Sequence, residues 1–325
     1  MRVSSTVPAA ARRRTGSGLN YLVISGLLWG TGGLTGSLLS RTAHLPATSV
    51  AAYRLLSGGV LIVVFLMVTG RRWPTGRAAW TRISLIGLLA AFYQGCYFTA
   101  VSLTSVPLAT LITIGTAPVI VLTVERVTDR GGNSRLTAAA SGLALLGLGL
   151  LVGLPSGFPE TRVAASAGMA LLAATGFSAV TLVGSRPVPG LDDLTVTGFG
   201  FLLGGLALLP LAADEGGLGF RPGPAAIGLL IALGTGPTAV AYTLYFRGLR
   251  AAAASTAAML TLLEPLTGTA LAAVVLGERL SATGIAGAVL LAAAVLLTVR
   301  AHAQRPERNP AEKNALARAG VGDGN

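Results

Sequence analysis

Charged residues are scarce in this 325-residue chain. They make up 11% of it, whereas hydrophobic residues make up 52%. A soluble globular domain carries about 25% charged residues, so the composition argues against a water-soluble fold. The hydrophobic residues also stand in long continuous blocks, whereas strands of a membrane β-barrel alternate polar and apolar residues. The sequence therefore predicts an all-α polytopic membrane protein.

Cysteine and histidine are also nearly absent. Cys96 is the only cysteine, so no disulfide can form within the chain. His44 and His302 lie far apart in the sequence, and neither has the further ligands nearby that a zinc site needs. No nucleotide motif is present, because the glycines of residues 30–36 follow no strand and precede no suitable acid. The sequence therefore predicts no cofactor.

Ten hydrophobic segments are long enough to cross a bilayer, which takes about 20 helical residues. The predicted spans are residues 20–40, 46–69, 83–103, 107–124, 136–153, 165–185, 194–212, 224–246, 252–276 and 282–299. The basic N-terminus resembles a signal peptide, but no A-x-A site follows, so the first span is expected to stay uncleaved. Residues 1–18 and 301–325 are polar and expected to be disordered and cytoplasmic.

Arginine and lysine gather on one side of the predicted bundle. With a cytoplasmic N-terminus, 19 of the 24 cations fall in cytoplasmic segments, four in external ones and one within a span. Because loops rich in these residues stay in the cytoplasm, both termini are predicted to be cytoplasmic. The excess of arginine over lysine, with abundant alanine and glycine, is typical of a GC-rich bacterium and places the chain in its inner (plasma) membrane. The net charge of +12 then suits an anionic lipid surface and not a nucleic acid.

The chain also repeats itself. Four segments of the first half recur in order in the second half, at offsets of 144, 148, 147 and 144 residues. They pair "LLWGTGGLTGSLLSR" with "LLAATGFSAVTLVGSR", "YFTAVSL" with "YFRGLR", "TAPV" with "LEPL", and "SRLTAAASGLALLGLGLLV" with "ERLSATGIAGAVLLAAAVLL". Five spans is an odd number, so the second copy enters the membrane upside down. Inverted repeats are typical of secondary transporters, whose substrate path lies between the repeats.

Three stretches resemble the EamA-domain members of the drug/metabolite transporter superfamily. They are "GLLWGTGG", "AYRLLSGGVLIVV" and "LLEPLTGTALAAVVLGERLSATGIAGAVLLAAAVLL", and the resemblance covers about residues 18–300. It implies ten helices in two inverted five-helix repeats, 19–154 and 164–300, with a cavity between them that serves export or exchange of small metabolites. The first half departs from the pattern, because Ala117 stands where the second half has Glu264.

Glu264 and Pro265 interrupt the ninth hydrophobic segment. A charge in mid-membrane costs roughly 2.5–3.5 kcal/mol, so Glu264 is expected to face the bundle or water. Pro265 lacks an N–H and frees the carbonyl near Thr261, and Pro118 marks the matching place in the fourth span. Paired interruptions of this kind point to a transporter's binding site. Glu264 is interpreted as a ligand for a cationic group or as a proton carrier, or else as a structural acid bonded to a neighbouring helix.

Arg54 is the other ionised residue in the interior of a span. It lies eight residues after Pro46, about 12 Å along a helix and hence near mid-membrane. Three roles are open: contact with a substrate carboxylate, snorkelling toward the surface, or an ion pair with Glu264. Glu125 and Glu278 are expected to be solvated charges at span ends.

Aromatic and polar residues complete the predicted cavity. Tyr93 and Tyr97 lie four residues apart and share a helix face. Such side chains orient ligands by stacking and hydroxyl hydrogen bonds, although buried tyrosines also serve helix contacts alone. The predicted substrate-binding residues are Trp29, Thr31, Arg54, Tyr93, Gln94, Tyr97, Tyr242, Tyr245 and Glu264. Close helix packing is expected at Gly30, Gly32, Gly33 and Gly36.

These features predict a secondary transporter of small organic metabolites, such as amino acids or amine-like and drug-like solutes, acting as an exporter or exchanger. Its predicted partners are the small-molecule substrate and the lipid bilayer, with no nucleic acid, and a homodimer is left open. An intramembrane enzyme would need paired aspartates, HExxH or a Ser/His set within the spans. The spans offer only Glu264 and Arg54 as ionised groups, so the sequence predicts no enzyme. A non-transporting membrane scaffold or lipid-handling protein is the remaining alternative.

Overall fold

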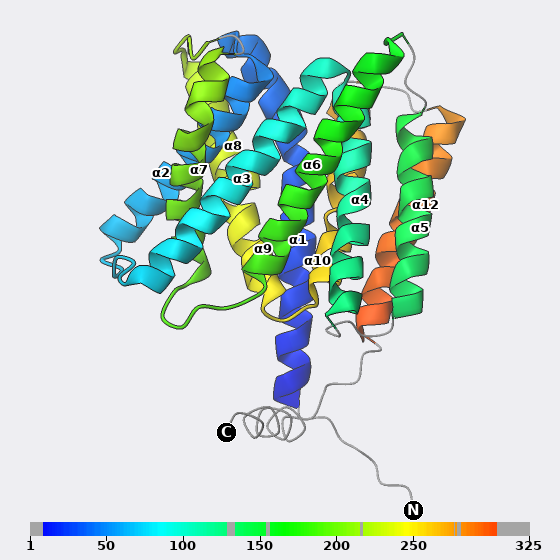
Figure 1. The fold of residues 1–325 in the computed structure, drawn as a ribbon, viewed down its shortest axis with the longest axis horizontal. Coiled ribbons are helices and arrows are strands. Elements are labelled where there is room, and N and C mark those ends of the chain that lie inside the picture. The colour runs from blue at the N-terminus through cyan, green and yellow to red at the C-terminus, as the bar shows by residue number, and fades with distance from the viewer. Residues whose placement is uncertain are drawn as a thin grey trace, which may run out of the picture.

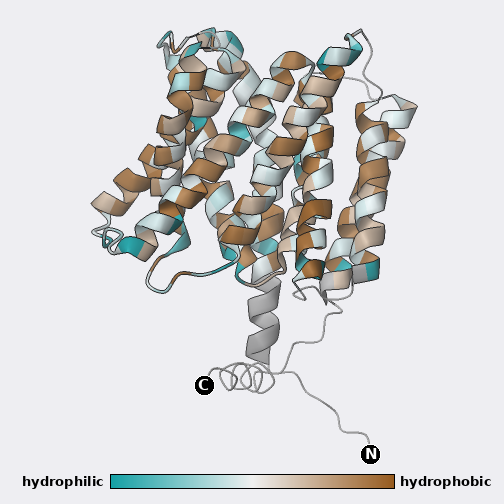
Figure 2. Ribbon diagram, in the orientation of Figure 1, coloured by the Kyte–Doolittle hydropathy of each residue, from teal (hydrophilic) through white to brown (hydrophobic). Residues whose placement is uncertain are grey.

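The computed structural model describes residues 9–128, 134–153, 157–214, 217–275, 277 and 281–303. Within these ranges all regular structure is helical, as the sequence predicts (Figure 1). Ten spans are long and apolar enough to cross a membrane, and each falls on one of the ten predicted segments. Hydrophobic residues cover the middle of the bundle and hydrophilic residues gather at its two ends (Figure 2).

Each repeat supplies five spans. The first repeat consists of α1 (Ala9–Ala43), α2 (Ala47–Val68), α3 (Arg77–Leu103), α4 (Val106–Val127) and α5 (Ser134–Val152). The second consists of α6 (Glu160–Gly184), α7 (Asp193–Asp214), α8 (Pro224–Gly234), the π-helix η1 (Thr235–Val240), α9 (Ala241–Leu249), α10 (Ala254–Leu260), α11 (Leu263–Val275) and α12 (Ala282–Ala303). The α8–η1–α9 series forms one span, and α10 with α11 forms another.

The helix ends correct the expected extent of the polar termini. α1 already begins at Ala9 and α12 continues to Ala303, so short parts of both segments for which the sequence predicts disorder are helical. Residues 1–8 and 304–325 lie outside the described part of the chain.

Helix packing relates the two repeats by a pseudo-twofold axis. α2 packs against α7 and α5 against α12, so equivalent helices of the two repeats pair with each other. α3 packs on α6 as α8 and α9 pack on α1, and α4 packs on α6 as α11 packs on α1. The α2–α7 and α5–α12 pairs lie at opposite sides of the bundle in Figure 1. Because each repeat has five spans, the two copies run in opposite directions, as predicted.

Glycine lets neighbouring helices approach closely. A Cβ added to Gly87 of α3 would lie 2.4 Å from the carbonyl oxygen of Gly200 in α7. A Cβ added to Gly287 of α12 would lie 2.5 Å from the carbonyl oxygen of Gly147 in α5. Lipid is as apolar as the helices, so close contact between small residues is what favours helix association in a membrane.

Two ion pairs join helix ends in the parts of the chain that the structure describes. Arg71 lies 3.5 Å from Asp192, and Arg250 contacts Asp193. Asp192 also caps α7, because its carboxylate accepts a hydrogen bond from the backbone N–H of Thr195 at 2.7 Å. The exposed Arg71–Asp192 pair is worth about 0–1 kcal/mol, so it orients the loops more than it stabilises the fold. The Arg250–Asp193 pair is more buried, with side chains 29% and 13% exposed.

Glu125 is a correction to the sequence analysis. It was expected to be a solvated charge, but its side chain is only 6% exposed and its Oε2 has no hydrogen-bond partner among the described residues. The reason is that α4 continues to Val127 and therefore carries Glu125 on the buried face that also holds Val121 and Leu122. Glu278 lies outside the described residues.

Candidate substrate-binding site

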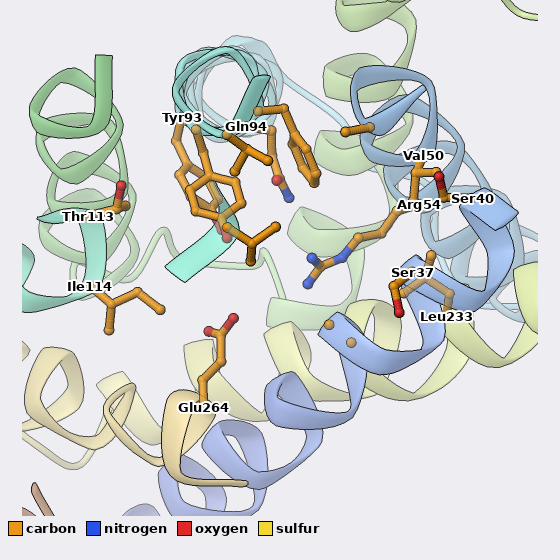
Figure 3. A pocket seen from close by; sticks show the side chains of 18 of the residues that line it. Ser37, Ser40, Val50, Arg54, Tyr93, Gln94, Thr113, Ile114, Leu233 and Glu264 are labelled. Carbon is orange, nitrogen blue, oxygen red and sulfur yellow. The ribbon is translucent and has the colours of Figure 1, made fainter. Parts of the chain in front are cut away.

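A cavity of about 250 Å³ lies between helices of both repeats (Figure 3). Five of the residues that the sequence nominates line it: Arg54, Tyr93, Gln94, Tyr97 and Glu264. The cavity continues to the end of the bundle at which α1 joins α2 and α3 joins α4. Its lining there includes Ser40, Ala47, Val101 and Val106.

A break in the ninth span places Glu264. α10 ends at Leu260 and α11 begins at Leu263. In a continuous helix the ring of Pro265 would clash with the Thr261 carbonyl, which instead accepts a hydrogen bond from the backbone N–H of Glu264 at 2.9 Å. The carbonyl that Pro265 frees is therefore satisfied within the turn. Glu264 stands in the first turn of α11, where the helix dipole favours a negative charge, and points into the cavity (Figure 3).

Gly30 of α1 allows the broken span to come close. A Cβ at this position would lie 2.9 Å from the carbonyl oxygen of Glu264 and 2.4 Å from Cβ of Thr267, so Gly30 has the packing role that the sequence predicts. Gly33 and Gly36 differ from this prediction, because they line the cavity and no backbone approaches them. Their missing side chains leave room for a ligand.

Arg54 of α2 is held by the second repeat. Its Nε donates to Oγ1 of Thr238 at 3.1 Å and its Nη2 donates to the carbonyl of Pro237 at 3.3 Å. Both acceptors belong to η1, and short π-helical turns frequently occur at functional sites. Oγ1 of Thr238 in turn donates to the carbonyl of Leu233 at 2.7 Å. These bonds fix the guanidinium at the cavity wall.

The sequence left open an ion pair between Arg54 and Glu264. Among the residues that the structure describes, these two side chains form no ion pair with each other. The two side chains instead point toward each other from opposite walls of the cavity (Figure 3). A positive and a negative group are thus both available to a ligand between them.

Gln94 of α3 adds an unsatisfied amide. The residue is 1% exposed, and neither Nε2 nor Oε1 has a hydrogen-bond partner among the described residues. An unpaired buried polar group costs about 1–3 kcal/mol. An amide both donates and accepts, so a polar group that enters the cavity can remove this cost.

Tyrosines form part of the cavity wall beside Gln94. The hydroxyl groups of Tyr97 and Thr110 lie 2.7 Å apart and share a hydrogen bond. The ring of Tyr93 lies 5.4 Å from that of Phe177, which also lines the cavity. The wall therefore offers aromatic faces next to the polar groups.

Four nominated residues lie outside the cavity lining. Trp29 lies 4.8 Å from Tyr242 and 5.0 Å from Tyr245 between ring centroids. With Phe177, these three form an aromatic cluster on the side of the cavity nearer the chain termini. Thr31, the fourth, uses its hydroxyl to donate to the carbonyl of Leu28 in its own helix.

Sequence reasoning missed part of the lining. Gly33, Gly36, Ser37 and Ser40 are spaced by three or four residues along α1 and all line the cavity. That spacing puts them on one helix face and could have indicated a stripe of small residues open to a ligand. Phe177 was also missed, although it occupies the position of the second repeat that corresponds to Gly33 at the offset of 144.

Comparison with known proteins agrees with this architecture. Both halves match the EamA-like transporter family, over residues 16–153 and 165–300. This chain belongs to the EamA-like transporter family.

Several known proteins are similar to this EamA-like transporter over most of their length. It is 29% identical to YwfM of Bacillus subtilis, an uncharacterized transporter, over 85% of this chain and 92% of that protein. It is 25% identical to YicL of Salmonella typhimurium, an uncharacterized inner membrane transporter, over 87% of this chain and 95% of that protein. A solved crystal structure that is 19% identical shares its fold, with a TM-score of 0.73 over 88% of this chain and 99% of the other.

Proposed function

We propose that this EamA-like transporter is a secondary transporter that exports or exchanges small organic metabolites, such as amino acids or amine-bearing and drug-like solutes. The observation that carries the proposal is the cavity into which Arg54, Gln94 and Glu264 project from three helices of two repeats. Two opposite charges and an unsatisfied amide on an apolar wall form the kind of polar set that fixes a small ligand in a pocket.

Each polar group has a role in this proposal. Arg54 binds a carboxylate or another anionic group of the solute, and its bonds to η1 hold it in place for that contact. Glu264 binds an ammonium group or carries a proton. Gln94 donates to and accepts from the part of the solute between them. Tyr93 and Phe177 cover the apolar part of the solute.

The inverted repeats supply the transport cycle. With both termini in the cytoplasm, the cavity opens to the outside and the cluster of Trp29, Phe177, Tyr242 and Tyr245 closes the inner side. Two similar halves of opposite direction can exchange their packing around a fixed site, which closes one side and opens the other. The chain lies in a bacterial plasma membrane in this scheme.

Flux through liposomes tests the proposal. Purified protein is reconstituted and given a panel of labelled amino acids, amines and organic anions, and initial rates of counterflow are measured for the wild type and for Glu264→Gln. At least one solute is expected to exchange, with a rate about 10- to 100-fold lower in Glu264→Gln, because a lost hydrogen bond to a charged group costs about 1.5–3 kcal/mol.

The matched control is Glu160→Gln, which alters an exposed acid at the start of α6 and should leave the rate unchanged. A protein that moves no solute of the panel would favour the scaffold alternative. Equal rates for wild type and Glu264→Gln would remove Glu264 from the site.

A further inference from the structure

A second hollow lies on the outer surface of the bundle. This groove has a volume of about 520 Å³ and runs between α2, α7 and the α8–η1–α9 span. Its wall is mostly apolar and includes the exposed side chains of Leu61, Phe65 and Val240. In a membrane such a surface faces the hydrocarbon, so the groove is filled by lipid or by another protein.

Two arginines line the same groove. Arg247 lies in the last turn of α9 and is exposed, and its side chain forms no hydrogen bond or ion pair with any residue that the structure describes. Arg71 follows the end of α2 and has only the contact with Asp192 at 3.5 Å, in which both side chains are about half exposed. With one acid beside two cations, this end of the groove is positively charged.

The dimensions of the groove match one leaflet. From Thr235 to Arg247 the chain rises roughly 18 Å at 1.5 Å per residue, and half of the hydrocarbon layer is about 15 Å thick. Thr235 lies in the middle of its span, whereas Arg247 lies near its end, on the side of the chain termini. The cations therefore stand at headgroup level and the apolar wall at the depth of an acyl chain.

We propose that this groove binds an anionic phospholipid of the cytoplasmic leaflet. Its phosphate lies against Arg71 and Arg247, and an acyl chain lies along Leu61, Phe65 and Val240. Basic pockets between helices on the cytoplasmic side suit anionic headgroups, and guanidinium groups bind phosphate through charge-assisted hydrogen bonds. The assignment of the leaflet rests on the orientation in the proposed function, but binding itself does not.

The charge of the groove favours lipid over a second copy of the chain. In a twofold dimer the same surface of both copies meets at the interface. The arginines of one copy would then share that interface with the arginines of its partner at the same depth. A phospholipid brings the opposite charge instead.

The bound lipid would touch the π-helical turn. Thr235, Ala239 and Val240 line the groove, whereas Pro237 and Thr238 of the same turn accept the hydrogen bonds of Arg54. The lipid site and the candidate substrate site are thus the two faces of η1.

Native mass spectrometry tests lipid binding directly. The detergent-purified protein is equilibrated with equal amounts of phosphatidylglycerol and phosphatidylcholine, and the lipids that remain bound are counted. One phosphatidylglycerol is expected to be retained in preference to phosphatidylcholine. Arg247→Gln should lower its retention about fivefold, the effect of losing one cation at an anionic lipid, and Val240→Trp should lower it by filling the groove.

Arg72→Gln is the matched control, because Arg72 is exposed beside Arg71 but does not line the groove. Equal retention of the two lipids, or equal losses in Arg72→Gln and Arg247→Gln, would overturn the proposal. A dimeric mass that Val240→Trp dissociates would overturn it in favour of a second copy. No solute flux is measured, so this result is independent of the test of transport.

Discussion

Equivalent positions of the two repeats have very different surroundings. Gly33 of the first repeat lines the cavity and leaves it open, whereas its counterpart Phe177 of the second lines the cavity with a ring that also joins the aromatic cluster. Tyr97 lines the cavity, whereas its counterpart Tyr245 is fully buried against Trp29 and Phe177. The repeats provide the same framework twice, and the size and placement of single side chains decide which side of it is open.

Pro118 and Pro265, which occupy equivalent positions of the two repeats, also have different effects on their helices. α4 continues through Pro118, and the neighbouring Ala117 is fully buried, with its carbonyl accepting a hydrogen bond from Ser178 at 3.2 Å. The second repeat is broken just before Pro265, and Glu264 faces the cavity. A proline alone therefore does not break the span, and the acid stands only in the half where the helix is interrupted.

Giving the first repeat the aromatic ring of the second should have the largest effect. Nothing lies within 4 Å of a Cβ at Gly33, so Gly33→Phe is expected to fold and to fill the cavity. A solute that must displace the ring loses about 1–3 kcal/mol, which lowers uptake on the order of 10- to 100-fold. Counterflow in liposomes measures this, with Gly168→Phe on the exposed side of α6 as control. Uptake at the wild-type rate would show that the solute does not pass Gly33.

Gly30 tests the contact that holds the broken span. Gly30→Ala places a Cβ against the Glu264 carbonyl and Thr267, and such overpacking costs about 1–3 kcal/mol. The expected result is a lower free energy of unfolding in detergent. Gly168→Ala has no such neighbour and should be neutral or stabilising by up to about 1 kcal/mol, the helix preference of alanine over glycine. Equal effects of the two substitutions would contradict the assigned role of Gly30.

Arg54 tests the link between the repeats. Arg54→Lys keeps the charge, but one ammonium cannot reproduce the two bonds from Nε and Nη2. A loss of about 1.5 kcal/mol corresponds to roughly tenfold weaker apparent affinity for the solute. The concentration for half-maximal uptake measures it, and Arg41→Lys at the exposed end of α1 should leave it unchanged. Unaltered affinity in Arg54→Lys would mean that charge alone matters.

Pro265 should have the smallest effect. Pro265→Ala restores an N–H that can donate to the Thr261 carbonyl, and one hydrogen bond of about 1 kcal/mol slows local amide exchange roughly fivefold. Hydrogen exchange over residues 261–266 measures this. Pro118→Ala likewise restores an N–H, here toward the carbonyl of Ile114, so exchange in α4 should slow by a similar factor although that helix is already continuous. Faster exchange in Pro265→Ala would show that the proline stabilises the broken form.

The ten spans were predictable because the thickness of hydrocarbon fixes how long an apolar helix must be. Arg54 and Glu264 were found because an ionised group in mid-membrane is costly and must face a cavity or a partner. The placement of Tyr242 and Tyr245 was not predictable in this way. They follow η1, and a π-helical turn changes the face that later residues present without altering the hydropathy of the segment.

Two further details could not be predicted from the sequence, also for physical reasons. Glu125 was expected to be exposed because the apolar run ends at Val124, whereas the helix continues to Val127. The choice of Pro237 and Thr238 as acceptors for Arg54 depends on how two repeats pack, and spacing along one chain does not contain that information.

The six residues of η1 lie between the cavity proposed for the solute and the groove proposed for the phospholipid. Thermodynamic linkage is reciprocal: if a phospholipid on one face of η1 strengthens the hold of the other face on Arg54, then a solute bound at Arg54 must tighten the grip on that phospholipid by the same factor. A cell that changes the headgroups of its envelope as it grows would thereby retune this carrier without synthesising a new one.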